Sequence, residues 1–149
     1  DSESYTINLE GSVDSNCELI PEGSGTYNVN MLETGNQGAL VITYSCNSPY
    51  TVSLQSLNGG MRHVESNGGV NIDYDVEATG FLPGTTTSTN SVTMQGTPVT
   101  IVTNNDWQNI FTNGGLRAGN LDLSFDSLAE YAVAGTYEDS EAVLVIDDL

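Results

Sequence analysis

Few side chains in this 149-residue chain have the type and spacing that catalysis requires. His63 is the only histidine and follows Arg62 in a short segment, so we expect a solvent-exposed side chain rather than a general base. Asp73 and Asp75 share one face of an alternating segment, but a chain with 20 acidic residues produces such pairs by chance. The Gly-x-Ser-x-Gly pattern of a nucleophile elbow is missing. The sequence therefore predicts a protein that is not an enzyme.

The acidic residues do not have the spacing of a dedicated metal site. The stretch 104–106 (Asn-Asn-Asp) offers one carboxylate, and Asp122 with Asp126 and the pair at 147–148 do not form an EF-hand pattern. We therefore expect no cofactor and no specific metal ligands.

Three aromatic residues, Trp107, Tyr131 and Tyr137, are candidates for a platform under a sugar ring. Aromatic residues of this kind more often pack in a core or cap a strand. They nevertheless support one alternative hypothesis, in which the chain is a secreted, monomeric carbohydrate-binding or adhesin domain.

The charge of the chain excludes whole classes of partner. Its 20 acidic residues stand against two basic ones, Arg62 and Arg117, which gives a net charge of −18. Nucleic acids and anionic membrane surfaces would be repelled by such a chain. No apolar run reaches the roughly 18 residues of a membrane-spanning helix, so we expect no membrane insertion.

The two cysteines, Cys17 and Cys46, bear on the compartment. A disulfide between them would contribute about 3 kcal/mol by closing a long loop, and the alternative is two buried free thiols. We favour the disulfide, because no CxxC motif or histidine cluster indicates a metal site. The chain shows no signal peptide, which leaves a cytosolic protein or a mature secreted form. A disulfide would favour the periplasm or the cell exterior.

Short alternating segments separated by turn residues predict an all-β fold in one domain. Such strands, recurring about every 8–12 residues, are typical of an antiparallel β-sandwich with Greek-key connections. Hairpin-type turns are expected at 58–60 and 67–69, exposed loops at 33–38 and 83–90, and a short helical turn within 104–115. The expected strands are 17–20, 26–32, 39–44, 50–54, 61–64, 70–76, 92–94, 99–102, 120–125 and 142–146.

The segment from Tyr5 to Val13 precedes the first cysteine and alternates in the manner of a half-buried strand. Its apolar face consists of Tyr5, Ile7, Leu9 and Val13, and its polar face of Thr6, Asn8, Glu10 and Ser12. No tight turn joins this segment to a partner strand. Periodicity alone favours an edge strand of the chain's own sheet, and the alternative is addition to the sheet of a neighbouring molecule.

Several local features together resemble a known family. An alternating strand precedes Cys17, and Cys46 ends the segment Ile-Thr-Tyr-Ser-Cys about thirty residues later. Further matches are Pro-Tyr-Thr-Val-Ser-Leu at 49–54, Val-Asn-Ile-Asp-Tyr at 70–74 and Ala-Gly-Thr-Tyr-Glu-Asp at 134–139. The chain resembles the spore coat protein U type pilin domain, the subunit of archaic chaperone–usher pili. The resemblance runs from about residue 5 to residue 146, but 81–115 has no counterpart.

The resemblance implies an incomplete immunoglobulin-like antiparallel β-sandwich that is completed by a donor strand from a neighbouring subunit. It divides the chain into a donor-strand extension at 1–13 and a pilin domain at 14–149. It also implies a disulfide between Cys17 and Cys46. The donor residues at the subunit interface would be Tyr5, Ile7, Leu9, Gly11 and Val13.

The same resemblance implies a structural pilus subunit that polymerises head-to-tail by donor-strand exchange. A periplasmic chaperone and an outer-membrane usher would be its partners during assembly, and identical subunits its partners in the filament. The product would be an extracellular, cell-surface filament that serves adhesion or biofilm formation. With this resemblance, we expect the segment at 5–13 to be donated to a neighbour.

Overall fold

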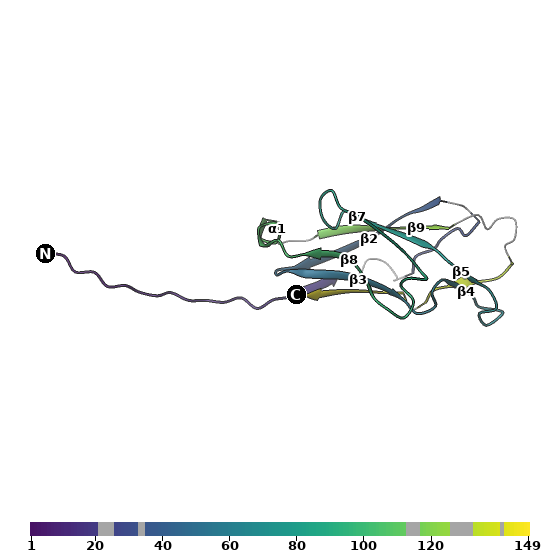
Figure 1. Ribbon diagram of the computed structural model, residues 1–149, viewed down its shortest axis with the longest axis horizontal. Helices are drawn as coiled ribbons and strands as arrows, with labels where there is room; N and C mark the ends of the chain where they lie inside the picture. Colours follow the sequence, from purple (N-terminus) through teal and green to yellow (C-terminus); the bar gives the residue numbers. More distant parts are fainter. Residues whose placement is uncertain (21–25, 33–34, 113–116, 126–132, 141) are drawn as a thin grey trace.

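The computed structural model describes six ranges of the chain: 1–20, 26–32, 35–112, 117–125, 133–140 and 142–149. Within these ranges the protein is all-β, with strands joined by turns and a single short helix (Figure 1). The elements are β1 Cys17–Ile20, β2 Gly35–Cys46, β3 Tyr50–Ser56, β4 Met61–His63, β5 Asn71–Ile72, β6 Asp75–Thr79, β7 Thr86–Asn90, β8 Val99–Asn104, α1 Trp107–Thr112, β9 Arg117–Phe125, β10 Tyr137–Glu138 and β11 Ala142–Asp148.

These strands form three sheets, and every pairing between named strands is antiparallel. The largest has the order β1-β2-β9-β6-β7, the second β11-β3-β8 and the smallest β10-β4-β5. β3 and β4 follow each other in sequence but belong to different sheets, so the turn at 58–60 connects two sheets and is not a hairpin. This part of the prediction is wrong.

The two larger sheets share one hydrophobic core. Tyr44 of β2 and Tyr50 and Val52 of β3 are fully buried, and Met94 in the turn after β7 is buried with them. β3 shows the alternation directly, because Tyr50, Val52, Leu54 and Ser56 are buried while the residues between them are half-buried. A strand with this period places one face on a core.

Much of the strand prediction is confirmed. β2, β3, β8, β9 and β11 contain the segments expected at 39–44, 50–54, 99–102, 120–125 and 142–146. The turn at 67–69 joins β4 to β5, and Asn67 and Gly68 adopt the positive φ angles (51° and 86°) that favour these residues in tight hairpins. α1 lies within the expected helical stretch.

Other expectations fail for identifiable reasons. The threonine-rich segment expected as a loop forms β7, because β-branched residues suit a strand and β6 offers a partner. Residues 92–94 form a turn instead of a strand, with Met94 inserted into the core. The segment 70–76 divides into β5 and β6, which belong to different sheets.

Two expectations concern segments beside β2. The stretch 26–32 pairs in no sheet, although Val29 and Met31 face the core as its alternation predicts. The predicted loop at 33–38 is partly replaced by β2, which begins at Gly35, and 33–34 lie outside the described residues. The nearly continuous apolar run at 39–44 is typical of a strand that is covered on both faces. β2 does lie between β1 and β9, but Val41 is exposed, so one face of the strand is not fully covered.

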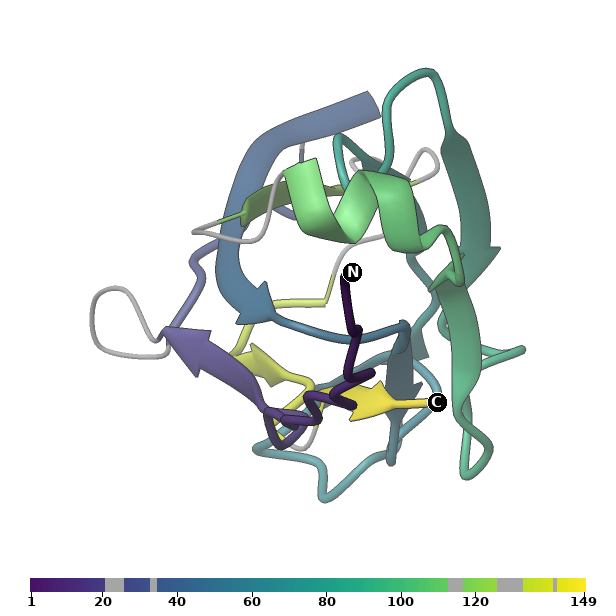
Figure 2. The same cartoon turned by 90° about the vertical axis from the view of Figure 1, so that its left-hand side faces the viewer.

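The first sixteen residues form no secondary structure and leave the body as an extended segment (Figure 1). We call residues 1–16 the extension. It departs from the end of the molecule at which β11 finishes, and α1 lies at that same end (Figure 2). In the isolated chain the extension is therefore not an edge strand of its own sheet.

Candidate functional site

The extension presents an apolar row that nothing in the described chain covers. Its side chains are exposed at 88% for Tyr5, 66% for Ile7, 88% for Leu9 and 90% for Val13. On the opposite side, the Asn8 amide donates a hydrogen bond to Glu10 Oε1 at 2.7 Å. A contact between residues two apart fits an extended backbone, in which alternate side chains share a face. The backbone is thus already in the conformation of a strand.

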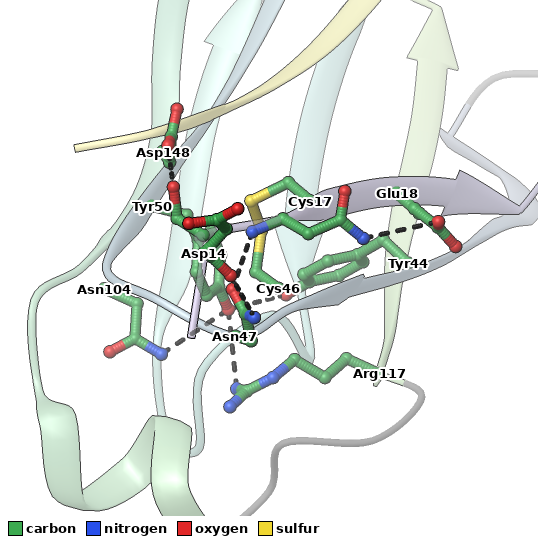
Figure 3. Close-up of a disulfide and its surroundings, with 12 residues drawn as sticks. Asp14, Cys17, Glu18, Tyr44, Cys46, Asn47, Tyr50, Asn104, Arg117 and Asp148 are labelled. Atoms are coloured by element: carbon green, nitrogen blue, oxygen red, sulfur yellow. Dashed lines mark hydrogen bonds between the residues drawn. A yellow bond between two sulfur atoms is a disulfide. The ribbon is translucent and has the colours of Figure 1, made fainter. Parts of the chain in front are cut away.

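The base of the extension is fastened to the body (Figure 3). The Asn47 side chain accepts a hydrogen bond from the backbone N–H of Asn16 at 2.7 Å and donates one to the carbonyl of Asp14 at 2.9 Å. The Ser15 hydroxyl donates to Asp148 Oδ2 at 2.7 Å. We call residues 14–16 with Asn47 and Asp148 the base clamp. It leaves Val13 as the residue next to the fastened part.

The predicted disulfide is confirmed, and it lies directly beside the base clamp. Cys17 of β1 and Cys46 of β2 are register partners and are joined through their sulfur atoms (Figure 3). Cys46 is almost completely buried. The bond ties β1 to its neighbour β2 in the large sheet at the point where the extension begins. Together, the bond and the clamp fix where the extension leaves the body.

A long groove opens at the other end of the molecule. One side is the segment 26–32, and the other is the chain from Val133 to Ala142 that leads into β11. Its volume is about 1240 Å³, above the roughly 300–1,000 Å³ of small-molecule pockets. The floor is lined by apolar side chains of several strands: Leu40, Leu54, Met61, Ile72, Val76, Leu121 and Leu123. A cleft of this size and lining suits an extended apolar segment.

β11 reaches this groove at its first residue, Ala142, and one edge of the strand pairs with no strand among the described residues. Its other edge pairs with β3 along its whole length, from Ala142 to Asp148. Leu144 and Ile146 pack against the core but stay half-buried, while Val143 and Val145 are 48% and 38% exposed. The edge therefore offers unpaired backbone groups beside apolar side chains that are incompletely covered.

His63 holds the groove wall, contrary to the expectation that it is exposed. It is 5% exposed, and its Nε2 lies 2.8 Å from the carbonyl oxygen of Ala134. Its Nδ1 lies 2.7 Å from the Ser66 hydroxyl, and its ring packs against Tyr137 at 5.0 Å between centroids. With both nitrogens and the ring engaged, the histidine is a structural support for the wall.

Glu65 completes this support, which we call the wall latch: His63, Glu65 and the segment 134–137. The backbone N–H of Thr136 donates to the Glu65 carboxylate at 2.8 Å, and this bond lowers the pKa of that carboxyl. Gly135 adopts a φ of 141°, and a Cβ there would collide with His63 Nε2. Only glycine therefore fits at this position of the wall.

A polar cluster lies at the end of the groove next to the latch. Asp139 Oδ2 accepts hydrogen bonds from the hydroxyls of Tyr74, at 2.5 Å, and Ser56, at 2.6 Å. Burial and this bond raise the pKa of Tyr74, so the hydroxyl remains a donor. Asp139 Oδ1 is buried and has no hydrogen-bond partner in the described structure. The groove thus contains an unsatisfied acceptor.

The aromatic platform considered from the sequence is not assembled by the described residues. Trp107 lies in α1, at the end that carries the extension, whereas Tyr137 packs on His63 at the groove. Tyr131 lies outside the described residues. The three side chains therefore do not gather in one place.

The other candidate residues also fail to converge. Asp73 lies between β5 and β6, and Asp75 is the first residue of β6. Both side chains are exposed. In the part of the chain that the structure describes, no three acidic, histidine or cysteine residues are grouped to hold a metal ion. The described helix is too short and too polar to cross a membrane.

Comparison with known protein families, curated proteins and solved structures finds no match for this chain. The site is therefore interpreted from its own geometry. Sequence reasoning found the apolar row but missed the groove, because the groove's lining is scattered from residue 26 to residue 142. The only available signal was the half-apolar segment 26–32, whose Val29 and Met31 line the groove without joining a sheet.

Proposed function

We propose that this protein is a structural pilus subunit that polymerises head-to-tail by donor-strand exchange into an extracellular filament for adhesion or biofilm formation. One observation carries the proposal: among the described residues, the same chain has an exposed apolar row on the extension and an open apolar groove that ends at Ala142, the first residue of a strand with one unpaired edge. Residues 5–13 of one copy would fill the groove of the next. The body is then an incomplete immunoglobulin-like sandwich that its neighbour completes.

The chemistry of the two surfaces supports this pairing. Tyr5, Ile7, Leu9 and Val13 would meet the leucine-rich floor, and Gly11 would pass where a small residue is needed. The backbone of the inserted strand would pair with β11. Its N–H groups could also donate a hydrogen bond to a buried acceptor that has no partner in the described structure, such as Asp139 Oδ1. The polar residues between them, including Asn8 and Glu10, would face solvent.

The ends of the molecule suggest the direction of insertion. The base clamp fastens Ser15 to Asp148, the last residue of β11, so the chain's own extension leaves from that end. The groove lies toward the other end, near Ala142. A donating neighbour there would lay its extension with Val13 near Ala142 and Tyr5 toward Asp148. The donor strand would then run antiparallel to β11.

The energy of this contact suits a permanent assembly. Burying four apolar side chains contributes about 6–12 kcal/mol at about 1.5–3 kcal/mol each, which is an upper estimate. The entire stability of a typical domain is about 5–15 kcal/mol. A donated strand is thus comparable with the rest of the fold. Because donor and acceptor surfaces differ, the contact is heterologous and can propagate without closing.

The proposal is tested with the variants Ile7→Asp and Leu9→Asp, singly and combined. Each places a carboxylate in the apolar groove, so the SDS-resistant polymers that we expect of the unaltered chain should be lost. The body should keep its β-sheet circular dichroism spectrum, because the extension makes no contact with its own groove.

The matched control is Thr6→Asp with Asn8→Asp, which adds the same charge to the opposite face of the same segment. This control should polymerise as the unaltered chain does. Polymers that persist in the Ile7→Asp/Leu9→Asp variant would contradict the proposal. So would an unaltered chain that stays a folded monomer with its first segment packed on its own sheets.

A further inference from the structure

The helix α1 carries an exposed aromatic pair. Trp107 is 65% exposed and Phe111 is 89% exposed, and residues four apart lie on one face of a helix. Their neighbour Ile110 is buried and packs in the hydrophobic core, which attaches the helix to the body. Two large aromatic side chains held together in solvent are typical of a surface that contacts another protein.

This helix is held firmly despite its six residues. The amide of the buried Asn104 donates to Asn109 Oδ1 at 2.9 Å, and Arg117 donates to the same oxygen at 3.0 Å and to the carbonyl of Asn109 at 3.3 Å. The Arg117 guanidinium also lies over the Tyr50 ring, at 5.7 Å from its centroid (Figure 3 shows Asn104, Tyr50 and Arg117). The aromatic pair is thus presented on a fixed support.

The position of α1 determines what the pair would meet in a filament. α1 lies at the end from which the extension leaves (Figures 1 and 2). Only four chain steps separate Val13 from Cys17, which span at most about 14 Å at about 3.5 Å each. The base clamp already fastens three of the intervening residues. A subunit that receives residues 5–13 must therefore lie against this end.

The receiving end offers a matching surface. A hollow of about 220 Å³ is lined by Leu57, Arg62 and Val64 together with Glu138 and Ser140, and the last two also line the groove. Leu57 is 53% exposed and Val64 is 40% exposed. Arg62 is one of only two cations in the chain, and a guanidinium is attracted to an aromatic face.

We propose that Trp107 and Phe111 of one copy dock on this hollow of the next copy, and so form a second contact between successive subunits. This inference rests on the proposed donor-strand assembly. The docking sets the aromatic pair against Leu57, Val64 and the Arg62 guanidinium beside the inserted strand, and it limits rotation of one subunit about the next. The partner is a second copy of this chain, because the short clamped link brings the two surfaces together.

Trp107 is the only tryptophan, so its fluorescence reports the contact directly. In polymers, the docked Trp107 side chain would be less exposed to water. We therefore expect its emission at shorter wavelength, and its quenching by acrylamide weaker, than in the monomeric Ile7→Asp/Leu9→Asp variant. Polymers whose Trp107 emission and quenching equal those of the monomer overturn the docking and leave donor-strand exchange standing. Failure to form any polymer contradicts the proposed function and this contact with it.

The Leu57→Asp variant tests the receiving side. It should form SDS-resistant polymers, because Leu57 lies outside the groove, but its Trp107 emission should return toward that of the monomer. The matched control is Val41→Asp, which adds the same charge at a valine of β2 that is 43% exposed. Equal spectra for the two variants would overturn the docking. A shift in the monomer's emission on adding glycans would assign the pair to sugar binding instead.

Discussion

The two ends of this molecule are built by different means. At the extension end, a disulfide and the base clamp fix the departing chain, and Arg117 holds α1 through Asn109. At the groove end, His63 hydrogen-bonds to the Ala134 carbonyl and Glu65 accepts a hydrogen bond from the Thr136 N–H, and no disulfide joins the described groove walls. In the proposed assembly, the fixed end would donate a strand and the open end would receive one.

The largest expected effect comes from closing the groove while leaving the extension intact. The Met31→Asp variant places a charge on a groove-lining residue that belongs to no sheet, so the body should fold. We expect it to form no polymers by itself. Mixed with the Ile7→Asp/Leu9→Asp variant, which has an intact groove but no functional donor, it should give a one-to-one heterodimer in size-exclusion chromatography with light scattering.

Val41→Asp is the matched control, because it adds the same charge at a 43% exposed residue of β2 that does not line the groove. This control should polymerise. Polymers of the Met31→Asp variant, or no heterodimer in the mixture, would show that the groove does not receive the extension.

A smaller effect is expected at the extension end. The double variant Cys17→Ala/Cys46→Ala removes the bond that closes a loop of 29 residues. The free energy of unfolding, measured by urea denaturation, should fall by about 3 kcal/mol because the unfolded chain gains freedom. The unaltered protein treated with reductant provides the comparison. An unchanged free energy of unfolding would mean that the base clamp alone holds β1 to β2.

The smallest effect concerns the wall latch. Because the Thr136 N–H lowers the pKa of Glu65 in the folded protein, the carboxylate stabilises the wall at neutral pH. This contribution is lost as the pH falls through the lowered pKa, below the usual value of about 4.3. An NMR titration of Glu65 should give a midpoint below that value. In the Gly135→Ala variant, the added methyl group should displace the Thr136 N–H from Glu65, so the midpoint should rise toward the usual value. A normal midpoint in the unaltered protein would contradict the latch.

The strands of the two larger sheets were predictable where apolar and polar residues alternate and the apolar face packs on the shared core. β3 is the example, because it repeats apolar residues every second position. β11 was predictable in another way, from the continuous apolar run at 142–146. The disulfide was also predictable, since Cys17 and Cys46 had no competing partner. The row at Tyr5 to Val13 could be read from its period, but its pairing with a neighbour stays a prediction.

Other features depend on contacts between distant parts of the sequence. The burial of His63 arises from Ala134, 71 residues away, and from Ser66 in the following turn. The strand β7 looked like a loop because its threonines are polar, and its partner β6 had been merged with β5. The groove became visible only once the segments around Met31 and Ala142 were placed in space.

In the proposed filament, residues 5–13 of one copy lie in the groove of the next. A high-resolution electron cryomicroscopy map of the native filament tests it most directly. The map should show Tyr5, Ile7, Leu9 and Val13 facing the neighbour's groove, with the donated strand antiparallel to β11. Residues 5–13 packed on their own subunit, or a filament whose grooves remain empty, would contradict the account.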